Sequence, residues 1–231
     1  RTDTNIDTIS GLVFNAWGDR SFDAPYGVWF DGDWDKPRLD DPAIQKGLSD
    51  YAGLMQAGPS DILSYNWNEA GNAFCNGQAA FFADASLFGP WFETDDCPIS
   101  KGNTGYMALP PQDKGGTSYT ANWQWGIGMG ANAQEKDAGW YFIQYMTNKA
   151  SEAVIGTFHG GAGRLSTWEN DSYTSTLNPD YVSATLESMK TVRTSVVPVK
   201  DFNKYALEIM DVILDIHGGA SSEDATAKGN E

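Results

Sequence analysis

The sequence predicts an α/β protein, because four short apolar stretches typical of strands alternate with helical patterns. Apolar residues at consecutive or alternating positions favour strands, whereas apolar residues three or four positions apart favour helices. Pairs such as Gly58-Pro59 and Pro110-Pro111 mark where these stretches stop. The length of 231 residues allows one or two domains.

Two helices are expected in the first half, after a long aromatic loop over 17–34. Asp41 suits the N-cap and Pro42 the first position of a helix that stops at Gly58. A second helix is expected over 68–77. Strands are expected over 6–14, 78–82, 104–109 and 123–129.

Helices dominate the second half of the chain. The last long one is capped by Gly218-Gly219, and a glycine-rich turn lies at 159–163. No internal repeat and no long linker are present. Helices are expected over 136–148, 151–158, 179–190 and 201–217, with a short tail helix from Ser221 or Ser222.

The charge balance argues against several classes of partner. Lys and Arg number 15 against 31 Asp and Glu, a formal net charge of −16. A surface this acidic repels phosphate backbones, so nucleic acid is not expected as a partner. No apolar stretch approaches the roughly 20 residues that a membrane helix needs.

The two cysteines, Cys75 and Cys97, have two interpretations. A disulfide is the preferred one, and it would place the protein outside the reducing cytosol. Two buried free thiols are the alternative. A metal site is not expected, because the only histidines, His159 and His217, lie far away in sequence. The acidic turn over 31–35 lacks the remainder of a calcium-loop pattern, so we interpret it as a solvated turn.

Motifs for cofactors and nucleophiles are missing. The glycines of 126–130 lack the G-x-G-x-x-G spacing, and neither a phosphate-binding loop nor G-x-S-x-G occurs. No cofactor is therefore expected. A carboxylate pair for glycoside hydrolysis stays open as an alternative, with Glu69 and Asp84 as the acid pair.

Aromatic residues give the strongest compositional signal, with 9 Trp, 10 Tyr and 11 Phe. Indole and amide side chains interleave at 66–69 and in Asn122-Trp123-Gln124-Trp125. Flat apolar rings can stack on the C–H faces of sugars while nearby polar groups bind the hydroxyls. Each tryptophan alone could equally fill the core, but these clusters favour a ligand site.

The order of several segments resembles the extracellular solute-binding proteins of ABC sugar importers, of the maltose-binding-protein type. The resemblance extends over nearly the whole chain, and the DAS segment is most similar to binders of polyols and monosaccharides. The segments are LMQAGP (54–59), NEA (68–70), FCNGQAA (74–80), DAS (84–86), GPW (89–91), GYMALP (105–110), WGIG (125–128), AGWYFIQYMT (138–147), GRLS (163–166) and VVP (196–198).

The resemblance implies a type II periplasmic-binding-protein fold, a two-lobed receptor that closes over its ligand. It implies that this chain supplies mainly the C-terminal lobe and is incomplete, since the first lobe has no counterpart; Arg1 in place of a start Met also indicates a processed chain or a fragment. We therefore expect 1–125 in the C-terminal lobe, 126–195 crossing to the N-terminal lobe, and 196–231 returning.

The resemblance also suggests ligand-binding residues. Trp91, Trp123 and Tyr205 match aromatic positions of the cleft, and Asn122 lies beside Trp123. Asp84 and Arg164 look like hydroxyl-binding groups, because a carboxylate accepts from two hydroxyls and a guanidinium offers several donors. A salt bridge at the hinge is the alternative for Arg164, and a cap at the end of a strand is the alternative for Asp84.

Three functions follow as hypotheses. The first is a periplasmic, or extracellular and membrane-tethered, sugar or polyol receptor: a non-catalytic monomer that delivers its ligand to the permease subunits of an ABC importer. The second is the glycoside hydrolase with Glu69 and Asp84, and the third is a lectin-like adhesion module.

Overall fold

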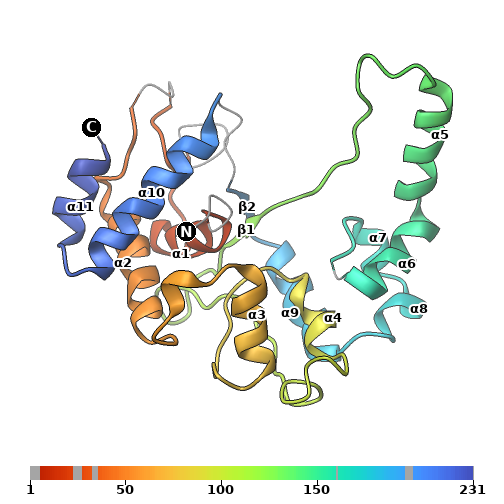
Figure 1. Cartoon of the computed structure of the whole chain (residues 1–231), viewed down its shortest axis with the longest axis horizontal. Coiled ribbons are helices and arrows are strands. Elements are labelled where there is room, and N and C mark those ends of the chain that lie inside the picture. Colours follow the sequence, from red (N-terminus) through yellow and green to blue (C-terminus); the bar gives the residue numbers. More distant parts are fainter. Residues whose placement is uncertain (1–5, 23–27, 33–35, 160, 196–199, 231) are drawn as a thin grey trace. The chain divides into compact units, whose positions relative to one another are not determined.

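The computed structural model describes residues 6–22, 28–32, 36–159, 161–195 and 200–230 (Figure 1). The chain divides into two compact units. The first unit comprises Arg1–Asp84, Ala108–Trp123 and Glu187–Glu231, and the second comprises Ala85–Met107 and Gln124–Leu186. Each unit is therefore built from segments that are distant in sequence.

The core of the first unit lies where α1 (Ile6–Trp17), α2 (Pro42–Gln56) and α10 (Phe202–His217) pack together. The short helix α11 (Ser222–Gly229) packs against α2 and α10. The side chains at the centre of this core are completely buried: Ile9, Val13, Phe14, Ile44, Leu48 and Ile213. The 3-10 turn η2 (Ile62–Ser64) and helix α3 (Trp67–Cys75) complete the helices of this unit.

The prediction of a strand over 6–14 was wrong, because this segment begins helix α1. Its buried side chains Ile6, Ile9 and Val13 are three or four residues apart, which is the spacing of one helix face. The same stripe continues to Trp17, beyond the end of the predicted strand. Helical spacing over 12 residues therefore outweighs the local run of β-branched residues.

The sheet of the first unit consists of two short parallel strands, β1 (Thr120–Asn122) and β2 (Val192–Thr194). Thr120 pairs with Val192, and Asn122 pairs with Thr194. The strands predicted over 78–82, 104–109 and 123–129 were wrong: none of these fully described segments forms a regular strand. A strand needs a hydrogen-bonded neighbour, and none of the three has one in the part of the chain that the structure describes.

Helix ends follow their capping residues, as predicted for α2. Asp41 Oδ1 accepts the backbone N–H of Ala43 at 2.9 Å, and Pro42 is the first helical residue. At α3, Asn66 and Glu69 form a capping box, which explains why the predicted helix over 68–77 begins one residue earlier. At the end of α10, Gly219 takes a φ of +105°, a conformation that favours glycine.

The predicted second-half helices are confirmed with small shifts in their bounds. They are α5 (Lys136–Thr147), α6 (Lys149–His159), α9 (Pro179–Met189), α10 and α11. Three short helices of the second unit were not predicted: α4 (Phe88–Phe92), α7 (Leu165–Trp168) and α8 (Asp171–Thr174). Four or five residues are too few for a periodic pattern to be visible in the sequence.

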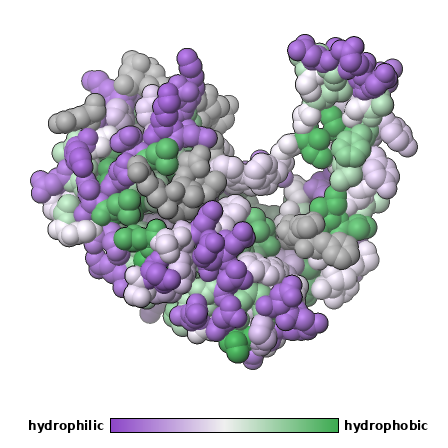
Figure 2. Space-filling view, viewed as in Figure 1, coloured by the Kyte–Doolittle hydropathy of each residue, from purple (hydrophilic) through white to green (hydrophobic). Residues whose placement is uncertain are grey.

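The second unit has a small aromatic core. Its buried residues are Ala162, Trp168, Tyr173 and Tyr181, with Tyr106 and Leu186 among those packed around them. Helix α5 packs against α6 but buries none of its own residues. Its large exposed side chains are Trp140, Tyr141, Phe142 and Tyr145. Figure 2 shows apolar residues at the surface over α5 and α6.

The preferred interpretation of the cysteines is confirmed: Cys75 and Cys97 form a disulfide, and both residues are buried. No helix in the described ranges combines the length and apolar character required to cross a bilayer. The assignment of 1–125, 126–195 and 196–231 to the lobes of a receptor stays a prediction; the divisions between the two units fall after residues 84, 107, 123 and 186.

Candidate functional site

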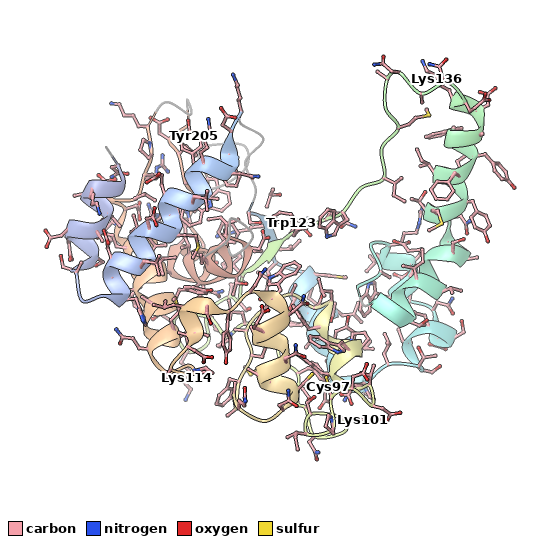
Figure 3. The ribbon with its side chains drawn as sticks, in the orientation of Figure 1. Cys97, Lys101, Lys114, Trp123, Lys136 and Tyr205 are labelled. Carbon is pink, nitrogen blue, oxygen red and sulfur yellow. The ribbon has the colours of Figure 1, made fainter. Side chains whose placement is uncertain are left out.

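Trp123 follows directly after β1 in the first unit, and 40% of its surface is exposed. Figure 3 shows it at the end of this strand. The next tryptophan, Trp125, is 77% exposed. Exposed indoles beside a strand end offer flat apolar faces, so this segment has the chemistry required for stacking on a sugar.

Asn122 is the last residue of β1, and its backbone joins it to a polar cluster. The hydroxyl of Ser195 lies 3.1 Å from the carbonyl oxygen of Asn122 and 2.5 Å from Oδ1 of Asp7. Ser195 follows β2 and is completely buried, while Asp7 lies in the first turn of α1. These three residues therefore join α1 to both strands.

Asp84 is half-buried and acts electrostatically on two neighbours. Its charge contributes to raising the pKa of Asp7 to about 6, although burial of Asp7 is the larger cause. Burial raises the pKa of Tyr51 on α2 to about 12, and the charge of Asp84 adds to this shift. A carboxylate near a second carboxyl and a phenol suits the acceptance of ligand hydroxyls.

Tyr205 lies near the start of α10 and is 45% exposed (Figure 3). Its ring meets the ring of Phe30 edge-on, with the centroids 5.2 Å apart. The contact with Phe30 fixes the orientation of the Tyr205 ring while leaving much of it accessible.

In the second unit, Trp91 lies on α4 within a cluster of aromatic rings. Its ring centroid is 5.7 Å from that of Phe88 and 5.7 Å from that of Phe92. Trp91 is half-buried, so this packing supports its ring from the interior side. Its role in ligand binding stays a prediction.

The guanidinium of Arg164 is held by the protein itself. Nε lies 3.1 Å from Oε2 of Glu152, and Nε and Nη2 donate to the carbonyl of Thr147 at 3.2 and 2.7 Å. The side chain is 51% exposed. Arg164 therefore forms a salt bridge with a partner in its own unit, and a binding role would use the remaining Nη1 donors.

Within the first unit, Asp7 brings two of the predicted residues together. It interacts with Asp84 through charge and with Asn122 through Ser195. Asp7, Ser195 and Tyr51 were missed by the sequence analysis. Asp7 was assigned to a strand, and recognising the helical spacing after it would have placed its carboxyl at a helix start.

Glu69, the second member of the alternative acid pair, is an exposed capping residue. Its Oε2 accepts the backbone N–H of Asn66 at 3.0 Å. Glu69 is therefore already engaged in holding the start of α3.

No cluster of three His, Cys, Asp or Glu side chains within the described ranges could hold a metal ion. Asp33 and Asp35 of the acidic turn lie outside those ranges.

Comparison with known families shows which family this chain belongs to. The model of the family described as bacterial extracellular solute-binding protein matches residues 4–153. This chain belongs to that family. The solute-binding chain is also 28% identical over 192 residues to the mannitol-binding protein of Pseudomonas aeruginosa, an alignment that covers 80% of this chain and 41% of that protein. The chain thus spans less than half of the length of this curated relative.

Solved structures show the same fold. A solute-binding protein from Agrobacterium radiobacter K84 in complex with ribitol matches with a TM-score of 0.74 and 19% identity, over 96% of this chain and 55% of that one. The maltose-bound MalE3 of T. maritima matches with a TM-score of 0.78 and 18% identity, over 99% and 56%. The solute-binding chain therefore has part of the type II periplasmic-binding-protein fold, as the resemblance implied.

Proposed function

We propose that this chain is part of the substrate-binding component of an ABC importer, which captures a sugar or polyol and delivers it to the membrane permease without chemical change. The observation that carries the proposal is the exposed indole of Trp123 directly after β1. Asp84 and Asn122, in the same unit as Trp123, supply acceptors for hydroxyl groups.

The ligand class is supported by the relatives. The curated relative is a mannitol-binding protein, and the structural relatives were solved with ribitol, maltose and, in a protein from Thermotoga lettingae TMO, α-D-tagatose. All four compounds carry several adjacent hydroxyl groups. A polyol or a monosaccharide is the ligand class that we favour.

Family membership supports the remaining parts of the proposal. The protein works as a monomer in the periplasm, or outside the cell on a membrane tether, and it meets the permease subunits of the importer there. It has no catalytic step. Glycoside hydrolysis is not advanced, because Glu69 is exposed and caps a helix.

A binding screen tests the proposal. Thermal unfolding of the full-length protein is followed with mannitol, ribitol, maltose and tagatose, because a bound ligand stabilises the native state by mass action. We expect at least one of these compounds to raise the melting temperature. No shift with any of them would contradict the ligand class.

A pair of variants tests the site. Trp123→Ala is expected to weaken binding by more than about 1 kcal/mol, roughly fivefold in affinity, because the indole face is lost. Phe81→Ala is the control, since Phe81 is an aromatic residue of the same unit that is 91% exposed and not among the candidates. Unchanged affinity in Trp123→Ala would remove Trp123 from the site.

A further inference from the structure

The hydroxyl of Ser195 lies between two acceptors. Its Oγ is 2.5 Å from Oδ1 of Asp7 and 3.1 Å from the carbonyl oxygen of Asn122. A serine hydroxyl carries a single hydrogen, so it can donate to only one of these oxygens. Ser195 is completely buried, which makes an unsatisfied contact between two oxygens costly.

A second hydrogen removes this conflict. If the carboxyl of Asp7 is protonated, it donates to Oγ of Ser195, and the serine then donates to the carbonyl of Asn122. Both oxygen contacts become hydrogen bonds of consistent direction.

We propose that Asp7 keeps its proton up to mildly acidic pH in the folded protein and then acts through Ser195 and the carbonyl of Asn122 as a positioning residue for Trp123. This chain of hydrogen bonds, from the carboxyl of Asp7 to Ser195 and from Ser195 to the carbonyl of Asn122, is called the relay below. It fastens α1 to the ends of both strands, immediately before the indole assigned to the ligand. The effect on ligand affinity rests on the proposed function, whereas the protonation of Asp7 does not.

The electrostatics around Asp7 agree with the relay. Burial raises the pKa of Asp7 to about 6, and the charge of Asp84 adds to that shift. The hydrogen bond with Ser195 acts in the opposite direction, as does the position of Asp7 at a helix N-terminus. Burial is the largest of the effects, so the neutral carboxyl is favoured up to mildly acidic pH.

The neighbouring elements supply no described cation that opposes this shift. On β2, Arg193 lies over the ring of Tyr119, with Cζ 3.5 Å from the ring centroid. On α10, Lys204 pairs with Asp201 at 3.2 Å. On α2, Lys46 pairs with Asp50, and the phenol of Tyr51 is kept neutral by its raised pKa.

The raised pKa of Asp7 determines how the stability of the protein changes with pH. The pKa of Asp7 rises from 3.8 to about 6 on folding, so the native state binds one more proton between these values. The contribution of Asp7 to stability is complete below about pH 4 and is lost as the pH rises through about 6. Ligand affinity is expected to fall over the same range as the relay loses its first donor.

The test measures the protonation of the Asp7 carboxyl directly. The ¹³C resonance of the Asp7 carboxyl is titrated by NMR in the full-length protein, and denaturant unfolding is measured from about pH 5 to about pH 8. The same pH series measures the affinity for mannitol and ribitol. The variants are Asp7→Asn, Asp7→Ala and, as a control on an exposed carboxylate of α5, Asp137→Asn.

Asp7→Asn decides the outcome, because its amide donates to Ser195 at every pH. We expect the Asp7 resonance to titrate near 6 and wild-type affinity to fall at least about threefold between pH 5 and pH 8. Asp7→Asn should bind with little pH dependence, and Asp7→Ala should bind more weakly throughout. Asp137→Asn should behave as the wild type.

Two results would overturn the relay: an Asp7 resonance that titrates near its ordinary value, or a pH dependence that persists in Asp7→Asn. A third result separates the two proposals. Titration near 6 in a protein that binds neither mannitol nor ribitol supports the relay and contradicts the proposed ligand class.

Discussion

Gly47 on α2 lies directly against the backbone of Val13 on α1. A Cβ atom at Gly47 would be 2.6 Å from the Cα of Val13, a distance that real Cβ contacts do not show. The absence of a side chain at Gly47 therefore sets how closely the two helices of the core approach one another.

Gly47→Ala is expected to destabilise the protein by about 1–3 kcal/mol, because the added methyl forces α1 and α2 apart. Gly53→Ala is the matched control on the same helix, since a Cβ there meets nothing within 4 Å. The control should be neutral or stabilising by up to about 1 kcal/mol through helix propensity. Denaturant unfolding of both variants measures the difference, and equal stability would show that the helices can separate without cost.

Asp41 has two roles at the start of α2: it caps the helix, and it accepts hydrogen bonds from Nη1 and Nη2 of Arg20 at 2.9 and 2.7 Å. Asp41→Ala is expected to cost about 1–2 kcal/mol, largely through loss of the cap. The hydrogen bonds from Arg20 are the main cause that lowers the pKa of Asp41 below 3.8. The stabilisation from this ion pair is thus present above pH 3.8 and is lost as the pH falls through the lowered pKa.

Asp41→Asn separates the two roles, because asparagine keeps the cap but not the charge. Its stability should lie slightly below that of the wild type near neutral pH and converge with it in acid. An equal gap between the two proteins at all pH values would contradict the ion-pair contribution.

The disulfide between Cys75 and Cys97 closes a loop with 21 residues between the cysteines. On the chain-entropy account, a loop of this size contributes about 3 kcal/mol. Cys75→Ala/Cys97→Ala is therefore expected to unfold at lower denaturant concentration, and a reducing agent should destabilise the wild type similarly. The double variant serves as its own control, since the reducing agent should leave it unchanged.

The sequence predicted the helices well wherever a cap or a long stripe was visible. Asp41-Pro42 located the start of α2, and the apolar stripe of α10 located its full length. Strands were predicted poorly, because pairing is not a local property. β1 obtains its neighbour from Val192–Thr194, about 70 residues later, and nothing in the segment itself indicates this partner.

The candidate site likewise has features that a local stretch of sequence reveals and features that only the fold creates. Trp123 and Trp125 stood out from their local surroundings, and both are exposed in the structure. The relay of Asp7, Ser195 and Asn122 joins three segments that are distant in sequence, so no motif could reveal it. Likewise, the salt bridge between Arg164 and Glu152 depends on the fold, and the sequence around Arg164 does not indicate it.

The assembly of the first unit from segments distant in sequence has a consequence for biosynthesis. Helix α1 is synthesised well before α10, which completes its burial and begins only at Phe202. Contacts of such long range form slowly, because a large loop must close before they contribute. The nascent polypeptide therefore keeps Ile9, Val13 and Phe14 incompletely covered until α10 has been synthesised, and during that interval chaperones can engage these side chains.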